Sequence, residues 1–90
     1  MITVKLPTIL RTHAGGRPEV QTDGETLGEV LESLEEQYPG LTLGIRGDDG
    51  ALRRHVNVYL NGEDVRYLGS LDAPVKGGDT IAILPAVAGG

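Results

Sequence analysis

The chain has 90 residues, which is enough for one domain with a small core. Thirteen acidic residues against eight basic ones give a net charge of −5, which argues against binding to the phosphates of nucleic acids. The absence of cysteine excludes disulfides and thiolate chemistry, and no apolar run approaches the roughly 20 residues of a membrane span. Because the sequence also shows no signal-peptide pattern, we expect a cytoplasmic protein without a membrane partner.

The first residues of the chain predict a hairpin of two strands. Apolar and polar residues alternate over Ile2–Leu6, as in a strand with one buried face, and Pro7 ends this strand because it has no N–H for the ladder. Residues 8–17 form a connection with its tip at Gly15-Gly16, and a weaker strand over 19–22 is expected to return beside the first.

An amphipathic helix is the next predicted element. Thr26 and Glu29 have the spacing of a capping box at its start, and Pro39-Gly40 stops it. Apolar residues recur at helical spacing, at Leu27, Val30, Leu31, Leu34 and Tyr38. The opposite face carries a run of glutamates that is typical of a solvated surface, at Glu29, Glu32, Glu35 and Glu36. Residues 41–54, which follow, have no regular pattern.

The second half of the chain predicts three more strands. Strict alternation resumes over Val56–Leu60. Asn61-Gly62 is a residue pair typical of a type I′ hairpin turn, so we expect a short return strand over 63–65. A last strand over 80–84 ends at Pro85.

These elements predict an α+β fold of the β-grasp, or ubiquitin-like, architecture. A helix with a single apolar stripe packs most compactly across one side of a mixed sheet whose strands each have one apolar face. The first and last strands are the most regular, so we place them parallel at the centre of the sheet. We expect a ubiquitin-like domain over 1–85 and a flexible tail over 86–90.

The two faces of this sheet have different predicted roles. Val30, Leu31 and Leu34 of the helix are expected to pack against one face, at Ile2, Val4, Val56, Val58, Ile81 and Ile83. The two-residue period then turns Tyr59, Ala82 and Leu84 to the opposite face. We predict that these three residues and Pro85 form an apolar partner interface, the alternative being an incidental apolar patch.

The sequence holds no recognisable catalytic or metal-binding constellation. His13 and His55 lie in separate loops, without the spacing of metal ligands. Asp48-Asp49-Gly50 lacks the full ligand set of a calcium loop and predicts a polar turn. The basic residues at 53–55 fit a solvated edge better than a partner contact. We therefore expect no catalytic residue, no metal site and no enzyme activity in this chain.

The strongest functional signal is the pair Gly89-Gly90. A glycine carboxylate has no Cβ beside the reacting carbon, and glycine backbones thread narrow channels in conformations that other residues avoid. The five residues beyond Pro85 reach at most roughly 16–18 Å when extended. This reach is enough to pass a terminal carboxylate into the active site of a partner while the folded body stays outside.

The predicted β-grasp body and the end of the chain together resemble the ubiquitin-like sulfur carriers of the MoaD and ThiS family. The end that carries the resemblance reads Ile83-Leu84-Pro85, followed by Ala86-Val87-Ala88-Gly89-Gly90. Within the family, the segment Pro7-Thr8-Ile9-Leu10-Arg11 and the residue Ala86 are most similar to the carriers of cysteine biosynthesis.

The resemblance implies that Gly90 is the reaction site and that the four residues before it thread a partner's active site. An adenylating enzyme would activate the Gly90 carboxylate with ATP, and sulfide equivalents would then displace AMP and leave a thiocarboxylate. A PLP-dependent cysteine synthase would use this sulfur on an aminoacrylate formed from O-phosphoserine, and a zinc metallopeptidase would release the cysteine. ATP, PLP and zinc would thus belong to the partner enzymes, and this chain would bind no cofactor.

Three alternatives remain open on the sequence alone. The chain is a sulfur carrier for molybdopterin or thiamine synthesis, a ubiquitin-like modifier joined to lysine side chains, or a β-grasp interaction module with an incidental Gly89-Gly90 pair. The first two need the same activation of Gly90 and differ in the acceptor.

Overall fold

The computed structural model describes residues 1–85, and residues 86–90 lie outside the described part of the chain. The strands and the main helix follow in the order β1 (Ile2–Lys5), β2 (Glu19–Thr22), α1 (Leu27–Gln37), β3 (Val56–Leu60), β4 (Glu63–Asp64) and β5 (Thr80–Pro85). Within residues 1–85, four 3-10 helices occupy the connections: η1 (Thr8–Ala14), η2 (Leu41–Gly44), η3 (Val65–Tyr67) and η4 (Ser70–Asp72). No helix in this range is both long and apolar enough to cross a membrane. The division into a domain over 1–85 and a tail over 86–90 stays a prediction.

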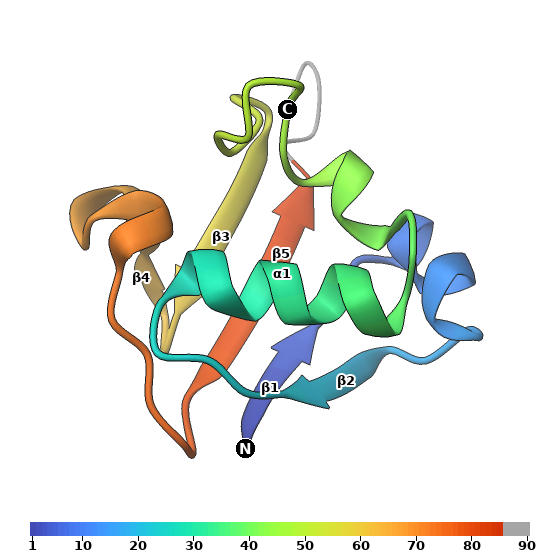
Figure 1. Cartoon of the computed structure of the whole chain (residues 1–90), viewed down its shortest axis with the longest axis horizontal. Helices are drawn as coiled ribbons and strands as arrows, with labels where there is room; N and C mark the ends of the chain where they lie inside the picture. The colour runs from blue at the N-terminus through green and yellow to red at the C-terminus, as the bar shows by residue number, and fades with distance from the viewer. Residues whose placement is uncertain (86–90) are drawn as a thin grey trace.

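The strands of residues 1–85 form one mixed sheet in the order β2-β1-β5-β3-β4. β1 and β5 run parallel at its centre, and all other neighbours are antiparallel. The helix α1 lies across one face of this sheet (Figure 1). The predicted β-grasp fold is therefore confirmed, including the parallel pairing of the first and last strands.

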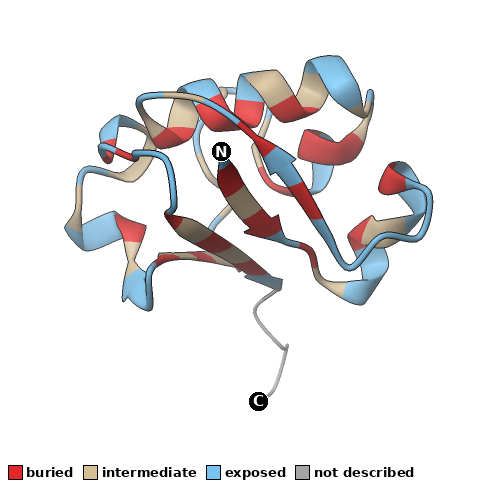
Figure 2. Ribbon diagram, turned by 90° about the horizontal axis from the view of Figure 1, so that it is seen from below, coloured by how far each residue is buried: buried red, intermediate tan, exposed pale blue. Residues whose placement is uncertain are grey.

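The core lies between α1 and the facing side of the sheet (Figure 2). The helix contributes Val30, Leu31 and Leu34, which are completely buried. Alternate strand residues are buried opposite them, at Ile2, Val4, Val56, Val58, Ile81 and Ile83. The predicted inner faces of the helix and of the strands are confirmed.

The start of α1 is fixed by reciprocal side-chain hydrogen bonds. The Glu29 amide donates to Thr26 Oγ1 at 3.2 Å, so Thr26 is the N-cap, as predicted. The Glu29 carboxylate reaches back to the Glu25 amide at 3.1 Å, one residue before the amide that a capping box normally uses. Gly24 permits this turn, because a Cβ atom there would lie 2.9 Å from the Val30 amide nitrogen.

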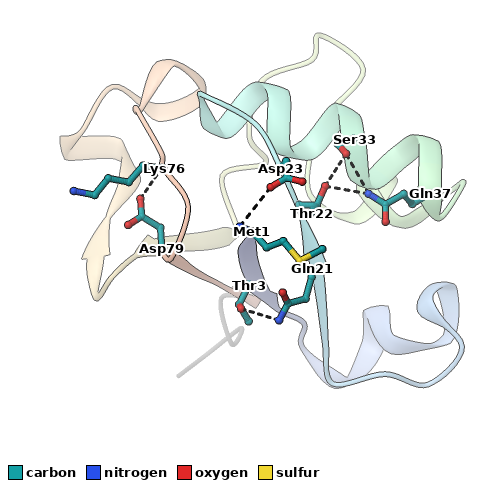
Figure 3. A network of polar contacts seen from close by, with 9 residues as sticks. All are labelled: Met1, Thr3, Gln21, Thr22, Asp23, Ser33, Gln37, Lys76 and Asp79. Atoms are coloured by element: carbon teal, nitrogen blue, oxygen red, sulfur yellow. Dashed lines mark hydrogen bonds and ion pairs between the residues drawn. The ribbon is translucent and has the colours of Figure 1, made fainter.

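A cluster of polar side chains joins β2 to α1 (Figure 3). The hydroxyl oxygens of Thr22 and Ser33 lie 2.6 Å apart, and Gln37 Nε2 donates to Thr22 Oγ1 at 3.0 Å. Thr22 is buried, and these bonds satisfy its hydroxyl group. The edge strand is thus tied to the helix by polar contacts as well as by packing.

The connections contain more structure than the sequence predicts. Residues 8–17 include η1, and residues 41–54 include η2 and an isolated bridge between Arg46 and Leu52. Four apolar side chains from these connections are buried in the core: Leu10, Ala14, Leu41 and Ile45. They cover the part of the core that one 11-residue helix leaves open.

The last strands differ from the prediction at their ends. Asn61 and Gly62 both have positive φ, at 51° and 90°, as the predicted turn requires. β4 has two residues rather than three, because Val65 is buried in the core and begins η3. β5 continues to Pro85, which pairs with Val56. Proline has no N–H to donate to the ladder, and β5 ends at this residue.

Candidate functional site

The face of the sheet opposite α1 brings together the predicted interface residues. Tyr59 and Ala82 are direct partners across β3 and β5, and Leu84 follows on the same face of β5. Tyr59 and Ala82 are half-buried, and Leu84 is 48% exposed. These three side chains form one apolar strip on the uncovered face. Their role in binding stays a prediction.

Two shallow hollows lie along this strip. One, of about 540 Å³, lies beside the β3–β4 turn and is lined by Lys5, Tyr59, Thr80, Ala82 and Leu84. The other, of about 670 Å³, lies between η1 and β5 and is lined by Lys5, Pro7, Ile9, Arg11 and Leu84. Ile9 is 69% exposed, and sequence reasoning did not assign it to the site. Strand alternation does not extend into η1, so no periodic signal marked it.

The strip ends where β5 ends. Pro85 is paired with Val56, so the described part of β5 ends beside the first residue of β3. The residues predicted to thread a partner and to react lie outside the described residues: Ala86, Val87, Ala88, Gly89 and Gly90. Their predicted roles therefore rest on the sequence.

A polar cluster holds the other end of β5 against the β3–β4 turn. Asn61 Nδ2 donates to Asp79 Oδ1 at 3.0 Å, and the Lys76 amide donates to Asp79 Oδ2 at 2.9 Å (Figure 3 shows the second bond). Asn61 Oδ1 in turn accepts from the Thr80 amide at 2.9 Å. The bonds from Asn61 and Lys76 hold the pKa of Asp79 below its ordinary value of 3.8.

Glu35 is a structural acceptor, which corrects the prediction of a wholly solvated glutamate face. Its carboxylate accepts hydrogen bonds from the Thr42 hydroxyl at 2.5 Å, the Gly40 amide at 2.7 Å and the Thr42 amide at 3.2 Å. The Thr42 hydroxyl, followed by the Gly40 amide, holds the pKa of Glu35 below its ordinary value of 4.5. Glu35 thereby fixes the turn from α1 into η2, whereas Glu32 and Glu36 are exposed as predicted.

The histidines and acidic residues do not converge on a site. Within residues 1–85 no three His, Asp or Glu side chains lie close enough together to hold a metal ion. His13 lies in η1 and His55 precedes β3, and both are exposed. The Ala51 amide donates to Asp49 Oδ1 at 3.0 Å, which confirms the predicted polar turn over 48–50.

The basic segment 53–55 is only partly the solvated edge that the sequence predicts. Arg54 and His55 are exposed. Arg53 is half-buried, and its Nε donates to the Leu43 carbonyl oxygen at 2.9 Å. The guanidinium of Arg53 is therefore held in place by η2.

A mixed sheet with a central parallel pair and one helix across it defines a ubiquitin-like β-grasp protein. The ThiS family model matches residues 4–90, nearly the whole chain. The chain belongs to the ThiS family.

Individual relatives cover the chain almost completely. It is 47% identical over 91 residues to the sulfur carrier protein CysO of Mycobacterium tuberculosis, which covers 99% of this chain and 98% of that protein. CysO in a crystal structure of the Amycolatopsis orientalis BexX/CysO complex matches with a TM-score of 0.94 and 48% identity, over 100% of both chains. The small archaeal modifier protein 1 of Haloferax volcanii is 39% identical over 88 residues, or 96% of this chain and 97% of that protein.

These comparisons confirm the predicted family and fold. The CysO relatives are carrier proteins rather than enzymes, in agreement with the prediction that this chain is not an enzyme. The similarity to CysO also agrees with the resemblance to cysteine-biosynthesis carriers within the family.

Proposed function

We propose that this chain is a sulfur carrier and that Gly90 carries the sulfur as a thiocarboxylate. The observation that supports this most strongly is the 47% identity to the sulfur carrier protein CysO over 99% of the chain. The match to the ThiS family also extends through Gly90.

In the proposed cycle an adenylating enzyme binds the chain together with ATP. A carboxylate oxygen of Gly90 attacks the α-phosphorus of ATP, and the bond from this phosphorus to pyrophosphate breaks. A sulfide equivalent then attacks the acyl carbon, AMP leaves, and the thiocarboxylate remains. The contribution of this chain is an acyl carbon without a neighbouring Cβ, which a narrow active site accepts readily.

The apolar strip is the proposed docking surface for this enzyme. The proposed partner binds Tyr59, Ala82, Leu84 and Pro85. It therefore lies at the end of β5, and in the sequence residues 86–89 connect this end to Gly90. An extended five-residue segment reaches roughly 16–18 Å, which suffices to enter a partner's active site. Tyr59 is the proposed anchor, because a tyrosine buries a large area at low entropic cost.

The proposed acceptor of the sulfur is the aminoacrylate that a PLP-dependent cysteine synthase forms from O-phosphoserine. The thiocarboxylate sulfur adds to the β-carbon, and the acyl group then shifts from sulfur to nitrogen, which leaves cysteine in amide linkage to Gly90. A zinc metallopeptidase hydrolyses this amide. The similarity to CysO supports this branch over molybdopterin or thiamine synthesis. The proposed cycle consumes ATP and O-phosphoserine, which supports a location in the cytoplasm as part of the proposal.

A second candidate function is covalent modification of proteins. It is favoured by the 39% identity to the small archaeal modifier protein 1 of Haloferax volcanii. Activation of Gly90 would be the same, but the ε-amino group of a lysine would attack the acyl carbon and form an isopeptide bond.

The intact mass of the chain purified from its native host tests both candidates. A sulfur carrier shows a fraction of molecules in which sulfur replaces one oxygen, and fragmentation locates this change at Gly90. The same spectrum shows whether Gly90 is the last residue of the mature chain, and a chain without Gly90 is the control. Conjugates at lysines on a denaturing blot, with no thiocarboxylate, would favour the modifier. A chain that carries neither modification would contradict both.

A further inference from the structure

Charge is unevenly distributed over this acidic chain. Residues 18–45, which contain α1, carry seven carboxylates and no Lys or Arg. Arg11, by contrast, lies just beyond β1, and Arg53 and Arg54 lie just before β3, so that these cations flank the end of β5. Within residues 1–85 the one ion pair shorter than 4.0 Å joins the Met1 amine to Asp23. No described carboxylate therefore pairs with these three arginines, which we call the arginine collar.

Backbone contacts orient two members of the arginine collar. Arg11 Nε donates to the Leu6 carbonyl oxygen at 3.2 Å, and Arg53 Nε donates to that of Leu43 at 2.9 Å. Each contact uses only Nε. Within residues 1–85 the Nη groups of Arg11 and Arg53 make no hydrogen bond. This outer edge of a guanidinium binds a carboxylate through two parallel hydrogen bonds.

A neighbouring arginine holds the segment that carries the collar. Arg66 Nη2 donates to the carbonyl oxygens of Arg53 at 3.0 Å and of Val56 at 2.8 Å. These bonds fix the backbone on both sides of Arg54, which is exposed and makes no side-chain hydrogen bond within residues 1–85. The Arg54 side chain is thus an exposed positive charge on a backbone segment that hydrogen bonds hold in place.

The two sides of the arginine collar meet at a small apolar hollow of about 50 Å³. Its lining includes Ile9, Leu10, Gly44, His55, Val56 and Ile83, so it joins η1, near Arg11, to the segment that follows Arg54. A Cβ atom at Gly44 would lie 2.9 Å from Leu10 Cδ2, so a larger residue there would require the Leu10 side chain to shift. The exposed Ile9 stands at this hollow, close to the end of β5.

We propose that the arginine collar docks onto a rim of carboxylates around the active site of the adenylating enzyme, with an aliphatic side chain of that enzyme against Ile9 at the hollow. The proposal rests on the proposed function and adds a second contact surface to the apolar strip. The exposed carboxylates of α1, Glu32 and Glu36, would repel such a rim, whereas the collar attracts it. Electrostatic attraction thus turns the end of β5 toward the partner before contact, which raises the association rate.

The test is the association rate constant of the chain with the adenylating enzyme of its native host, measured by stopped flow at several salt concentrations. Arg54→Glu reverses the free charge of the collar. Lys76→Glu changes the net charge equally at the opposite end of β5, where the Lys76 side chain extends away from Asp79 (Figure 3). We expect Arg54→Glu to slow association about tenfold at low salt and to flatten the salt dependence. Lys76→Glu should stay within about twofold of the wild type.

The hollow is tested through the dissociation rate. Ile9→Ser should speed dissociation several-fold, while Tyr67→Ser, at an 88% exposed residue of η3, should leave it unchanged. Equal changes of the association rate constant in Arg54→Glu and Lys76→Glu at every salt concentration would contradict the proposed role of the arginine collar. If the wild type and Arg54→Glu are both converted to the thiocarboxylate and bind the adenylating enzyme equally well, the docking role of the collar is wrong and the proposed function stands. If the enzyme does not convert the wild type, both are wrong.

Discussion

The side chain of Asn61 donates a hydrogen bond to Asp79, 18 residues further along the chain, at 3.0 Å. The two residues stand at the β3–β4 turn and immediately before β5, so this bond joins the start of β5 to its neighbour. Asp79 is only 7% exposed, and Asn61 also accepts a hydrogen bond from the Thr80 amide. The contact holds the start of β5, which is the end of the strand opposite to Pro85.

The ionised form of Asp79 is predicted to stabilise the fold. Because its folded-state pKa lies below 3.8, its contribution is fully present above pH 3.8 and is lost as the pH falls through the folded-state value. Asp79→Asn should lower the free energy of unfolding at neutral pH, and the difference from the wild type should shrink in acid. Chemical denaturation across pH measures this, with Asp48→Asn in the exposed turn as the control. A difference that does not change between neutral and acid pH would contradict it.

Leu31 tests the packing of α1 on the sheet. Its side chain has 0% exposure, so Leu31→Ala removes core packing and should lower the free energy of unfolding by about 2–5 kcal/mol. The neighbouring Glu32→Ala, on the exposed face of the same helix, should change it by less than about 0.5 kcal/mol. Urea denaturation of both variants gives the comparison. A similarly small loss for Leu31→Ala would show that this side chain is not part of the core.

Gly90 tests the proposed reaction site. Deletion of Gly90, or addition of an alanine after it, should abolish formation of the thiocarboxylate in a reconstituted reaction with the adenylating enzyme, ATP and a sulfide source. The thermal unfolding temperature should stay nearly unchanged, since glycine has no side chain to pack. Mass spectrometry and a thermal melt of the same samples separate loss of chemistry from loss of fold. A fully active extended chain, with no processing detected, would refute the assignment.

The apolar strip is tested by removing its two largest side chains. Tyr59→Ala combined with Leu84→Ser should weaken binding to the adenylating enzyme several-fold or more, because Tyr59 and Leu84 present apolar area on the uncovered face. Tyr67→Ala removes a more exposed tyrosine, 88% exposed on η3, and should have no effect. Titration calorimetry measures both variants, with circular dichroism to verify folding. Wild-type affinity of the double variant would place the interface elsewhere.

The strands, the helix and their inner faces could be predicted because each is a repeating local pattern. The alternation over Val56–Leu60 assigns Val58 to the core and Tyr59 to the other face without knowledge of any neighbour. The capping pair Thr26 and Glu29 is equally local. The predicted β-grasp body and the residues of the chain end, including Gly89-Gly90, likewise resembled the MoaD and ThiS family before any contact was known.

Features that depend on partners distant in sequence could not be predicted. Glu35 looked like its exposed neighbours on α1 until η2 placed the Thr42 hydroxyl beside it. Arg66 carries no pattern that relates it to Val56, yet its guanidinium binds that residue's carbonyl oxygen.

The sequence by itself therefore indicated the family, through the resemblance of the predicted body and of the chain end. It also predicted the β-grasp order of elements and the inner faces of β1, β3 and β5, because these follow from short-range periodicity. Only the tertiary structure decided which cations surround the end of β5 and which carboxylates act as structural acceptors. The positions of Arg11 and Arg54 relative to one another follow from the order β1-β5-β3 in the sheet, where strands far apart in sequence become neighbours. Such contacts form only when the whole core closes, and no local pattern encodes them.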